Sequence, residues 1–183
     1  MRAAGVATAG WVDRGSGRVA YATENLPGWT GTPIAEELEA EVGIPVAVEN
    51  DANAAAVAEK HFGAARNIAD FVCITLGTGV GGGCYAAGRL NTGHHFFANA
   101  LGHICIEPEG LACNCGQIGC LEVYANAAAL VRYAGDPALD TAEKVIRASN
   151  SGNAGARRAI HVYASYLAKG CACIIHIDRK SVV

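Results

Sequence analysis

Three cysteines within eight residues constrain the fold of this chain more than any other feature of its sequence. The stretch ACNCGQIGCLE holds them around Gly116 and Gly119, and the nearest preceding histidine completes the spacing H-x9-C-x-C-x4-C. The four residues are His103, Cys113, Cys115 and Cys120. One imidazole and three thiolates form a tetrahedral zinc set, and the glycines allow the tight turn that lets the thiols converge. Four protein ligands leave no open coordination position, so this zinc would be structural rather than catalytic.

The cluster has two alternative interpretations, a loop of free thiols without metal and a disulfide. The sequence has neither a charged start followed by an apolar run at Met1 nor an apolar run of membrane-spanning length, so we expect a cytoplasmic protein with no membrane partner. Thiols stay free or bind metal in that reducing compartment, which disfavours the disulfide. The other cysteines lie in apolar runs and are expected to be small core residues: Cys73, Cys84, Cys105, Cys171 and Cys173.

Composition excludes several classes of protein. A chain of 183 residues is long enough for one compact domain or two small lobes, and a hydrophobic share of 51% suits a well-buried enzyme rather than a disordered segment. The formal net charge of -3 provides no basic surface, so we expect no nucleic-acid partner for this segment. Small polar substrates fit this composition better.

Alternating strand and helix signals indicate an α/β fold. The first part is expected to contain strands at residues 4–9, 19–23 and 45–49, a helix at 33–42 and a helix from Asn50 or Asp51 to Gly63. The second part is expected to contain a strand, glycine turn and strand over 70–90, irregular chain over 93–119 with a short strand at 104–106, and helices at 122–133, 141–149 and 154–175. We place a lobe boundary between residues 64 and 65.

The glycine-rich stretch LGTGVGGG, residues 76–83, contains the pattern G-x-G-x-x-G. A dinucleotide site would need a helix directly after it, but CYAAGRL follows and is typical of a strand, which disfavours a Rossmann fold. A glycine turn between antiparallel strands can still offer several backbone N–H groups to a phosphate, with the Thr78 hydroxyl as a further donor. A tight hairpin without a ligand is the alternative.

Asp51 follows a buried strand and opens a helix, where α/β folds place ligands and catalytic groups. The alternative is an ordinary helix N-cap. Glu49, Asn50 and Asp51 together set three polar side chains at this strand end. A carboxylate there could accept a proton from a sugar hydroxyl, a contribution of about 10² to 10⁴ in rate.

Three stretches in this order resemble the ROK family of bacterial sugar kinases and sugar-responsive regulators: VENDANAAAVAE, TLGTGVGGG and GHICIEPEGLACNCGQIGCLE. The resemblance covers nearly the whole chain, is closest to the glucokinases of that family, and has the metal pattern as its most specific part. It implies an actin-like ATPase (ribonuclease H-like) fold, with two lobes, a cleft between them and a structural zinc loop. It also implies ATP with Mg²⁺ as donor, a hexose or N-acylhexosamine as substrate, and homodimers or homotetramers.

The resemblance also implies roles for individual residues. Asp51 matches the general base, and His103 matches a zinc ligand that also borders the sugar pocket. The segment ENLPGW resembles a sugar-side segment and contributes Asn25. The implied sugar-binding residues are therefore Asn25, Asn50, His103 and Glu122, and the implied phosphate-binding residues are Gly77, Thr78 and Gly79.

The chain departs from the family pattern just before its candidate zinc histidine. The family runs A-G-E-x-G-H, whereas ANALGH here puts Ala100 in place of a sugar-binding glutamate. Bulky residues 94–97, HHFF, replace a typically small, glycine-rich stretch. The missing carboxylate removes one or two charge-assisted hydrogen bonds of about 1.5 to 3 kcal/mol each, so sugar preference or affinity should differ. Asn99 and His95 are the candidates for compensation.

Both ends of the chain are expected to be truncated. Family kinases open with a D-x-G-G-T phosphate-gripping turn, which would lie before Met1, and continue into an adenosine-binding segment beyond Ile177. We interpret residues 178–183 as a non-native tail, with a genuine short basic terminus as the alternative. The 183-residue chain itself is therefore expected to show no ATP-dependent glucose phosphorylation.

The complete parent is accordingly expected to be an ATP-dependent sugar kinase, glucokinase-like or an N-acylhexosamine kinase, that transfers the γ-phosphoryl of ATP with Asp51 as general base. The alternative is the sugar-binding domain of a ROK-type transcriptional regulator with its DNA-binding domain upstream of Met1. Asp51 favours the kinase because a sensor needs no base, whereas Ala100 weakly favours the regulator. A zinc-stabilised module without ligand is the third hypothesis.

Overall fold

The computed structural model describes residues 2–24 and 26–177. The chain divides into two compact units: Met1–Cys73 with Gly82–Asn99, and Ile74–Gly81 with Ala100–Val183. The lobe boundary expected between residues 64 and 65 stays a prediction. The tail at 178–183 lies outside the described residues, as does Asn25.

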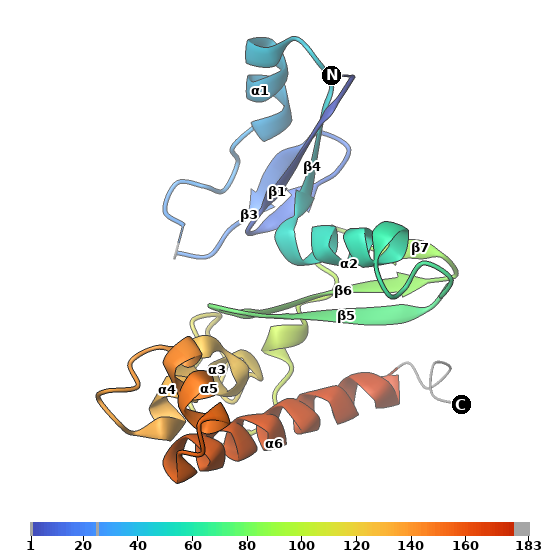
Figure 1. Ribbon diagram of the computed structural model, residues 1–183. Helices are drawn as coiled ribbons and strands as arrows, with labels where there is room; N and C mark the ends of the chain where they lie inside the picture. Colours follow the sequence, from blue (N-terminus) through green and yellow to red (C-terminus); the bar gives the residue numbers. More distant parts are fainter. Residues whose placement is uncertain (1, 25, 178–183) are drawn as a thin grey trace. The chain divides into compact units, whose positions relative to one another are not determined.

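The first unit is built on a parallel pair of strands. β1 (Ala4–Thr8) and β4 (Val46–Asn50) pair in register from Ala4 opposite Val46 to Thr8 opposite Asn50. Helix α1 (Ile34–Val42) lies beside them in Figure 1 and stops at Gly43, which adopts the left-handed conformation at φ 67 that ends many helices. The carboxyl ends of both strands therefore meet at one edge, where α/β sheets place their ligands.

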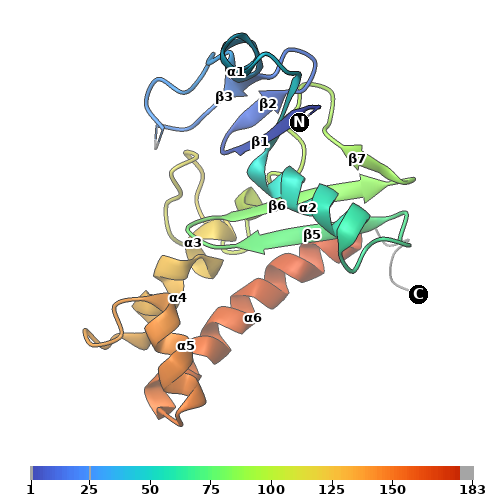
Figure 2. The ribbon, with the colours of Figure 1, turned by 45° about the horizontal axis from the view of Figure 1, so that its top comes forward.

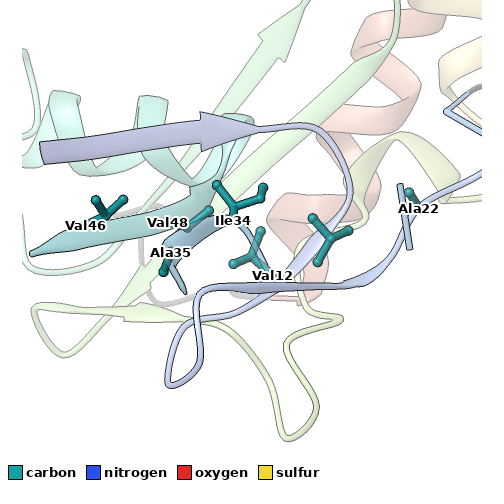
Figure 3. Close-up of a cluster of buried hydrophobic side chains, with 7 residues drawn as sticks. Val12, Ala22, Ile34, Ala35, Val46 and Val48 are labelled. Carbon is teal, nitrogen blue, oxygen red and sulfur yellow. The ribbon is translucent and has the colours of Figure 1, made fainter. Parts of the chain in front are cut away.

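An antiparallel hairpin of β2 (Trp11–Asp13) and β3 (Arg18–Tyr21) completes this part of the unit. The sequence did not predict β2, whose three residues are too few for an alternation to stand out. Asp13 closes the turn, because its Oδ1 accepts from the Gly15 backbone N–H at 2.8 Å. The hairpin, α1 and β4 share one hydrophobic core (Figure 3), formed by Val12, Val19, Ala22, Ile34, Ala35, Val46 and Val48.

Helix α2 (Asp51–Phe62) follows β4 without an intervening loop. Asn50 is its N-cap, because the Asn50 Oδ1 accepts from the backbone N–H groups of Ala52 and Asn53, each at 3.0 Å. The helix packs closely on strand β6 (Val80–Ala86) at Gly83, where an added Cβ would lie 2.5 Å from the Cβ of Ala56. A larger residue than glycine at position 83 would therefore push the helix away.

A second sheet has the strand order β5-β6-β7, with β5 at Phe71–Leu76 and β7 at Arg89–Asn91. Strands β6 and β7 are antiparallel, with Cys84 opposite Asn91. The turn between β5 and β6 is the glycine-rich stretch, and the Gly77 N–H donates to the Gly79 carbonyl across it at 3.0 Å. The predicted arrangement of strand, glycine turn and strand is confirmed.

The second unit is mainly helical. Its described residues form a short 3₁₀ helix, η1, and four α-helices: η1 (Leu101–His103), α3 (Glu122–Ala125), α4 (Ala127–Ala134), α5 (Ala142–Asn150) and α6 (Ala154–Ile177). Helices α4 and α5 pack against α6 (Figure 2) around Leu130, Val145, Ala156 and Ala159. Among residues 2–24 and 26–177, no helix combines the length and the apolar character that crossing a bilayer requires.

One helix prediction in this unit was wrong. The continuous helix expected at 122–133 is two helices, because Asn126 leaves the helical conformation at φ -91 and ψ 172. Its side-chain oxygen then caps α4 by accepting from the Ala129 N–H at 2.8 Å.

Candidate functional site

The four residues with metal-ligand spacing converge in the second unit. The candidate donor atoms of His103, Cys113, Cys115 and Cys120 all lie within 4.8 Å of one another. The His103 Nδ1 lies 3.7 Å from the Cys113 Sγ, and the Sγ atoms of Cys115 and Cys120 are 3.6 Å apart. A tetrahedron with the bond lengths of zinc has sulfur–nitrogen edges of about 3.6 Å and sulfur–sulfur edges of about 3.8 Å. These two separations are close to those edges, so the four residues form a candidate site for one metal ion.

Backbone geometry explains why the loop closes. Gly116 and Gly119 have φ values of 90 and 78, in the left-handed region that favours glycine. Gly119 also packs against the chain, since an added Cβ would lie 1.8 Å from the Glu107 carbonyl oxygen. The Cys113 N–H donates to the Gln117 carbonyl at 2.8 Å, which closes the turn between the first and third thiols.

Cys113, Cys115 and Cys120 are thiols, and the disulfide alternative for the cluster is not formed. Burial raises the pKa of Cys113 and Cys120 above the usual thiol value. At Cys115 partial burial acts in the same direction, but hydrogen bonds from the Gln117 backbone and the neighbouring thiols outweigh it and lower the pKa. Buried thiolates need a compensating positive charge, which a divalent cation supplies. Cys105, expected in the core, is exposed instead.

Helix α3 ties the metal loop to the helices behind it. The Tyr124 hydroxyl accepts from the Leu111 backbone N–H at 2.7 Å, and Gly110 leaves room for this hydroxyl, which would lie 2.0 Å from an added Cβ. The Tyr163 hydroxyl of α6 donates to the Ala125 carbonyl at 2.7 Å. The loop that carries the thiols is therefore fixed to the helical core by tyrosines that sequence reasoning did not single out.

The glycine loop and Glu122 lie in the same unit as the metal cluster. Gly77 and Thr78 are exposed, so the loop between β5 and β6 is open to a ligand. Glu122 is half-buried at the start of α3, and its Oε2 accepts from the Val80 backbone N–H at 3.0 Å. The structure thus brings together, in one unit, the implied phosphate loop, the implied sugar ligands His103 and Glu122, and the cluster of metal-ligand candidates.

Asn50 and Asp51 lie in the first unit, at the carboxyl end of β4. Asp51 is exposed, and its Oδ1 accepts from the Asn50 Nδ2 at 3.1 Å and from its neighbour Ala52 N–H at 2.9 Å. The Asn50 Nδ2 also donates to the Gly10 carbonyl at 2.9 Å, which ties this strand end to the end of β1. Because Asn50 is the N-cap of α2, the capping role does not account for Asp51.

Arg14 and Asn53, which sequence reasoning missed, support this strand end by contacting Glu49. The Glu49 Oε2 is buried and has no hydrogen bond of good geometry, but the Arg14 Nε lies 2.8 Å from it as an ion-pair partner. The Glu49 Oε1 accepts from the Asn53 Nδ2 at 3.1 Å. Arg14 lies in the hairpin turn, far from Glu49 in the sequence, so local sequence patterns do not predict this ion pair.

The stretch before His103 has a strained backbone at two residues that carry side chains. Phe96 and Asn99 have φ values of 66 and 68, which side chains rarely adopt. The Asn99 Nδ2 donates to the Asn53 Oδ1 at 3.2 Å and to the Asn91 carbonyl at 2.5 Å. The His95 Nε2 lies 3.1 Å from the His94 Nδ1. Both candidates for compensating Ala100 are thus engaged with this unit's own residues.

Comparison with known proteins agrees with these observations. The family model described as "ROK family" matches residues 1–183. A glucokinase from Streptomyces coelicolor is 47% identical over 142 residues, which cover 78% of this chain and 44% of that protein. A ROK family glucokinase from Streptomyces griseus, solved with glucose and AMPPNP, matches with a TM-score of 0.87 and 36% identity over 97% of this chain and 62% of its own. A xylose repressor from Caldicellulosiruptor bescii is 30% identical and covers 98% of this chain and 48% of the repressor.

The chain spans about half the length of the relatives it matches. Its α/β content and its structural neighbours agree with the actin-like ATPase type of fold that the motifs implied. The match extends over the whole chain, and the chain is identified as a member of the ROK family.

Proposed function

We propose that the complete protein is an ATP-dependent sugar kinase that phosphorylates a hydroxyl of a hexose or N-acylhexosamine. The observation that carries the proposal is the position of Asp51. Its carboxylate is exposed at the carboxyl end of a parallel strand, and it is not the N-cap of α2, because Asn50 has that role. The greater identity to a glucokinase than to a repressor supports the kinase over the regulator.

Asp51 is suited to act as the general base. Its Oδ1 is held by the Asn50 amide and the Ala52 N–H, and no other described residue bonds to its Oδ2. The Oδ2 would accept the proton of the attacking sugar hydroxyl as that oxygen bonds to the γ-phosphorus of ATP and the ADP oxygen leaves. Transfer of this kind depends on positioning and on neutralising charge, and a bound Mg²⁺ would supply the charge neutralisation.

The other implied residues complete the proposal. The glycine loop at Gly77, Thr78 and Gly79 would offer N–H and hydroxyl donors to phosphate. Asn25, Asn50, His103 and Glu122 are the proposed sugar ligands, with Asn50 also orienting Asp51. The cluster of one imidazole and three thiols would hold a structural zinc ion. The protein would be cytoplasmic and a homodimer or homotetramer, with two lobes around a cleft.

A coupled assay on the longest reading frame that contains this sequence tests the proposal. The frame is expected to form ADP only when ATP and one of glucose, mannose, N-acetylglucosamine, N-acetylmannosamine or fructose are present. Asp51→Asn should lower kcat by about 10² to 10⁴ with little change in sugar affinity. Tight sugar binding without turnover, combined with an upstream helix-turn-helix, would instead establish the regulator.

A further inference from the structure

Val80, the first residue of β6, is held by residues that flank two of the metal-ligand candidates. Glu122 lies two residues after Cys120, and its Oε2 accepts the Val80 N–H at 3.0 Å. Leu121, between them, is fully buried and packs in one cluster with Val80 and Ala125. Only Leu121 and Glu122 therefore separate Cys120 from the contact with Val80. Leu121 packs on Val80, and Glu122 accepts its N–H.

A second contact with Val80 comes from the residue that precedes His103. Gly102 directly precedes His103 and packs so tightly that an added Cβ would lie 2.1 Å from the Val80 carbonyl oxygen and 3.2 Å from the Val80 Cβ. Only glycine allows this approach. Val80 is thus bonded through its N–H to Glu122, two residues after one ligand candidate, and packed through its carbonyl against Gly102, directly before another.

The rest of the glycine loop is anchored in the same way. The carboxylate of Glu122 lies against Gly79, where an added Cβ would be 2.6 Å from the Oε2. At the start of the loop the Gly77 carbonyl accepts from the Ala127 N–H of α4 at 2.8 Å. The loop is therefore held by residues of α3, α4 and η1.

We propose that Glu122 is a positioning residue that couples the geometry of the metal cluster to the glycine loop. Its Oε2 fixes the Val80 N–H and thereby the direction of the loop amides, while its Oε1, which accepts no hydrogen bond from a described residue, stays available to a substrate hydroxyl. The coupling itself is a property of this unit. That the loop so positioned receives the phosphoryl donor rests on the proposed function.

The simpler alternative is that Glu122 only opens α3, where an acidic side chain favours the helix N-terminus. That role would stabilise α3 without affecting the Val80 amide specifically. Exchange of single backbone amides, measured by NMR on the 183-residue chain, separates the two.

The test compares Glu122→Ala with Glu109→Ala, the same truncation at an exposed carboxylate of the metal loop. With metal content and circular dichroism unchanged, Glu122→Ala should raise the exchange rate of the Val80 amide by at least about tenfold, and Glu109→Ala should leave it within about threefold. An unchanged Val80 rate in Glu122→Ala overturns the proposal. If Glu122→Ala does not fold, Glu122→Gln replaces it. The Gln side chain keeps an acceptor oxygen and should keep the Val80 amide protected from exchange. Loss of that protection in folded Glu122→Gln would also overturn the proposal.

Metal removal supplies the second arm. Treating the wild-type chain with a zinc chelator should raise exchange at Val80, and the same treatment of Glu122→Ala should add little. Val80 protection that is indifferent to the chelator would show that cluster and loop are not coupled. Neither readout involves turnover, so either can fail while the kinase assay succeeds, and the reverse.

Discussion

Two glycines among the cluster thiols have the same backbone conformation but different surroundings. Gly116 and Gly119 both have positive φ, but the space around Gly116 is open, whereas Gly119 presses against the Glu107 carbonyl. Their role in turning the chain could be predicted from their positions among the thiols. The close approach to Glu107 could not, because nothing in the loop sequence indicates which segment passes beside it.

Gly119→Ala is expected to lower the free energy of unfolding by at least about 3 kcal/mol and to lower metal affinity. The reason is that strain at positive φ is combined with a clash against the Glu107 backbone. Gly116→Ala, the matched control, carries only the strain and should cost about 1 to 2 kcal/mol. Urea unfolding and metal titration of the two variants measure both quantities. Equal effects of the two substitutions would show that the contact with Glu107 does not matter.

At the scale of elements, periodicity and turn chemistry predicted most of the fold. Strands β1, β3 and β4 and helices α1, α2, α5 and α6 lie close to their expected positions. The break at Asn126 was missed because the apolar pattern continues across it, and only the cap on Ala129 reveals it. The pairing of Arg14 with Glu49 and of Glu122 with Val80 joins elements far apart in sequence, which local patterns do not encode.

The hairpin of β2 and β3 should show a defined acid dependence through Asp13. Hydrogen bonds from the Ser16 hydroxyl and the Gly15 N–H lower the pKa of Asp13 below 3.8. Its contribution to stability is therefore present above about pH 4 and is lost as the pH falls through the lowered folded value. An NMR titration should place this pKa below the usual range, and Ser16→Ala should move it back upward. An Asp13 pKa at or above its usual value would contradict the turn geometry.

The whole chain should unfold in two parts that respond differently to metal removal. The core of the first unit, around Val12, Val19 and Val48, and the metal-ligand candidates belong to different units of the chain. A structural zinc can contribute on the order of 10 kcal/mol to the folding of its surroundings, so a chelator should melt the metal loop first. In calorimetry, one transition should move to lower temperature and the other should stay. A uniform shift of all the heat absorption would contradict this independence.

The central claim is that His103, Cys113, Cys115 and Cys120 hold one tetrahedral ion. It is central because the proposed sugar ligand His103 and the proposed coupling to Val80 both depend on that ion. X-ray absorption of the purified chain tests this most directly. The account predicts one zinc per chain with one nitrogen at about 2.0 to 2.1 Å and three sulfurs at about 2.3 Å. A chain without stoichiometric metal, or a spectrum fitted by oxygen ligands in place of sulfur, would contradict it.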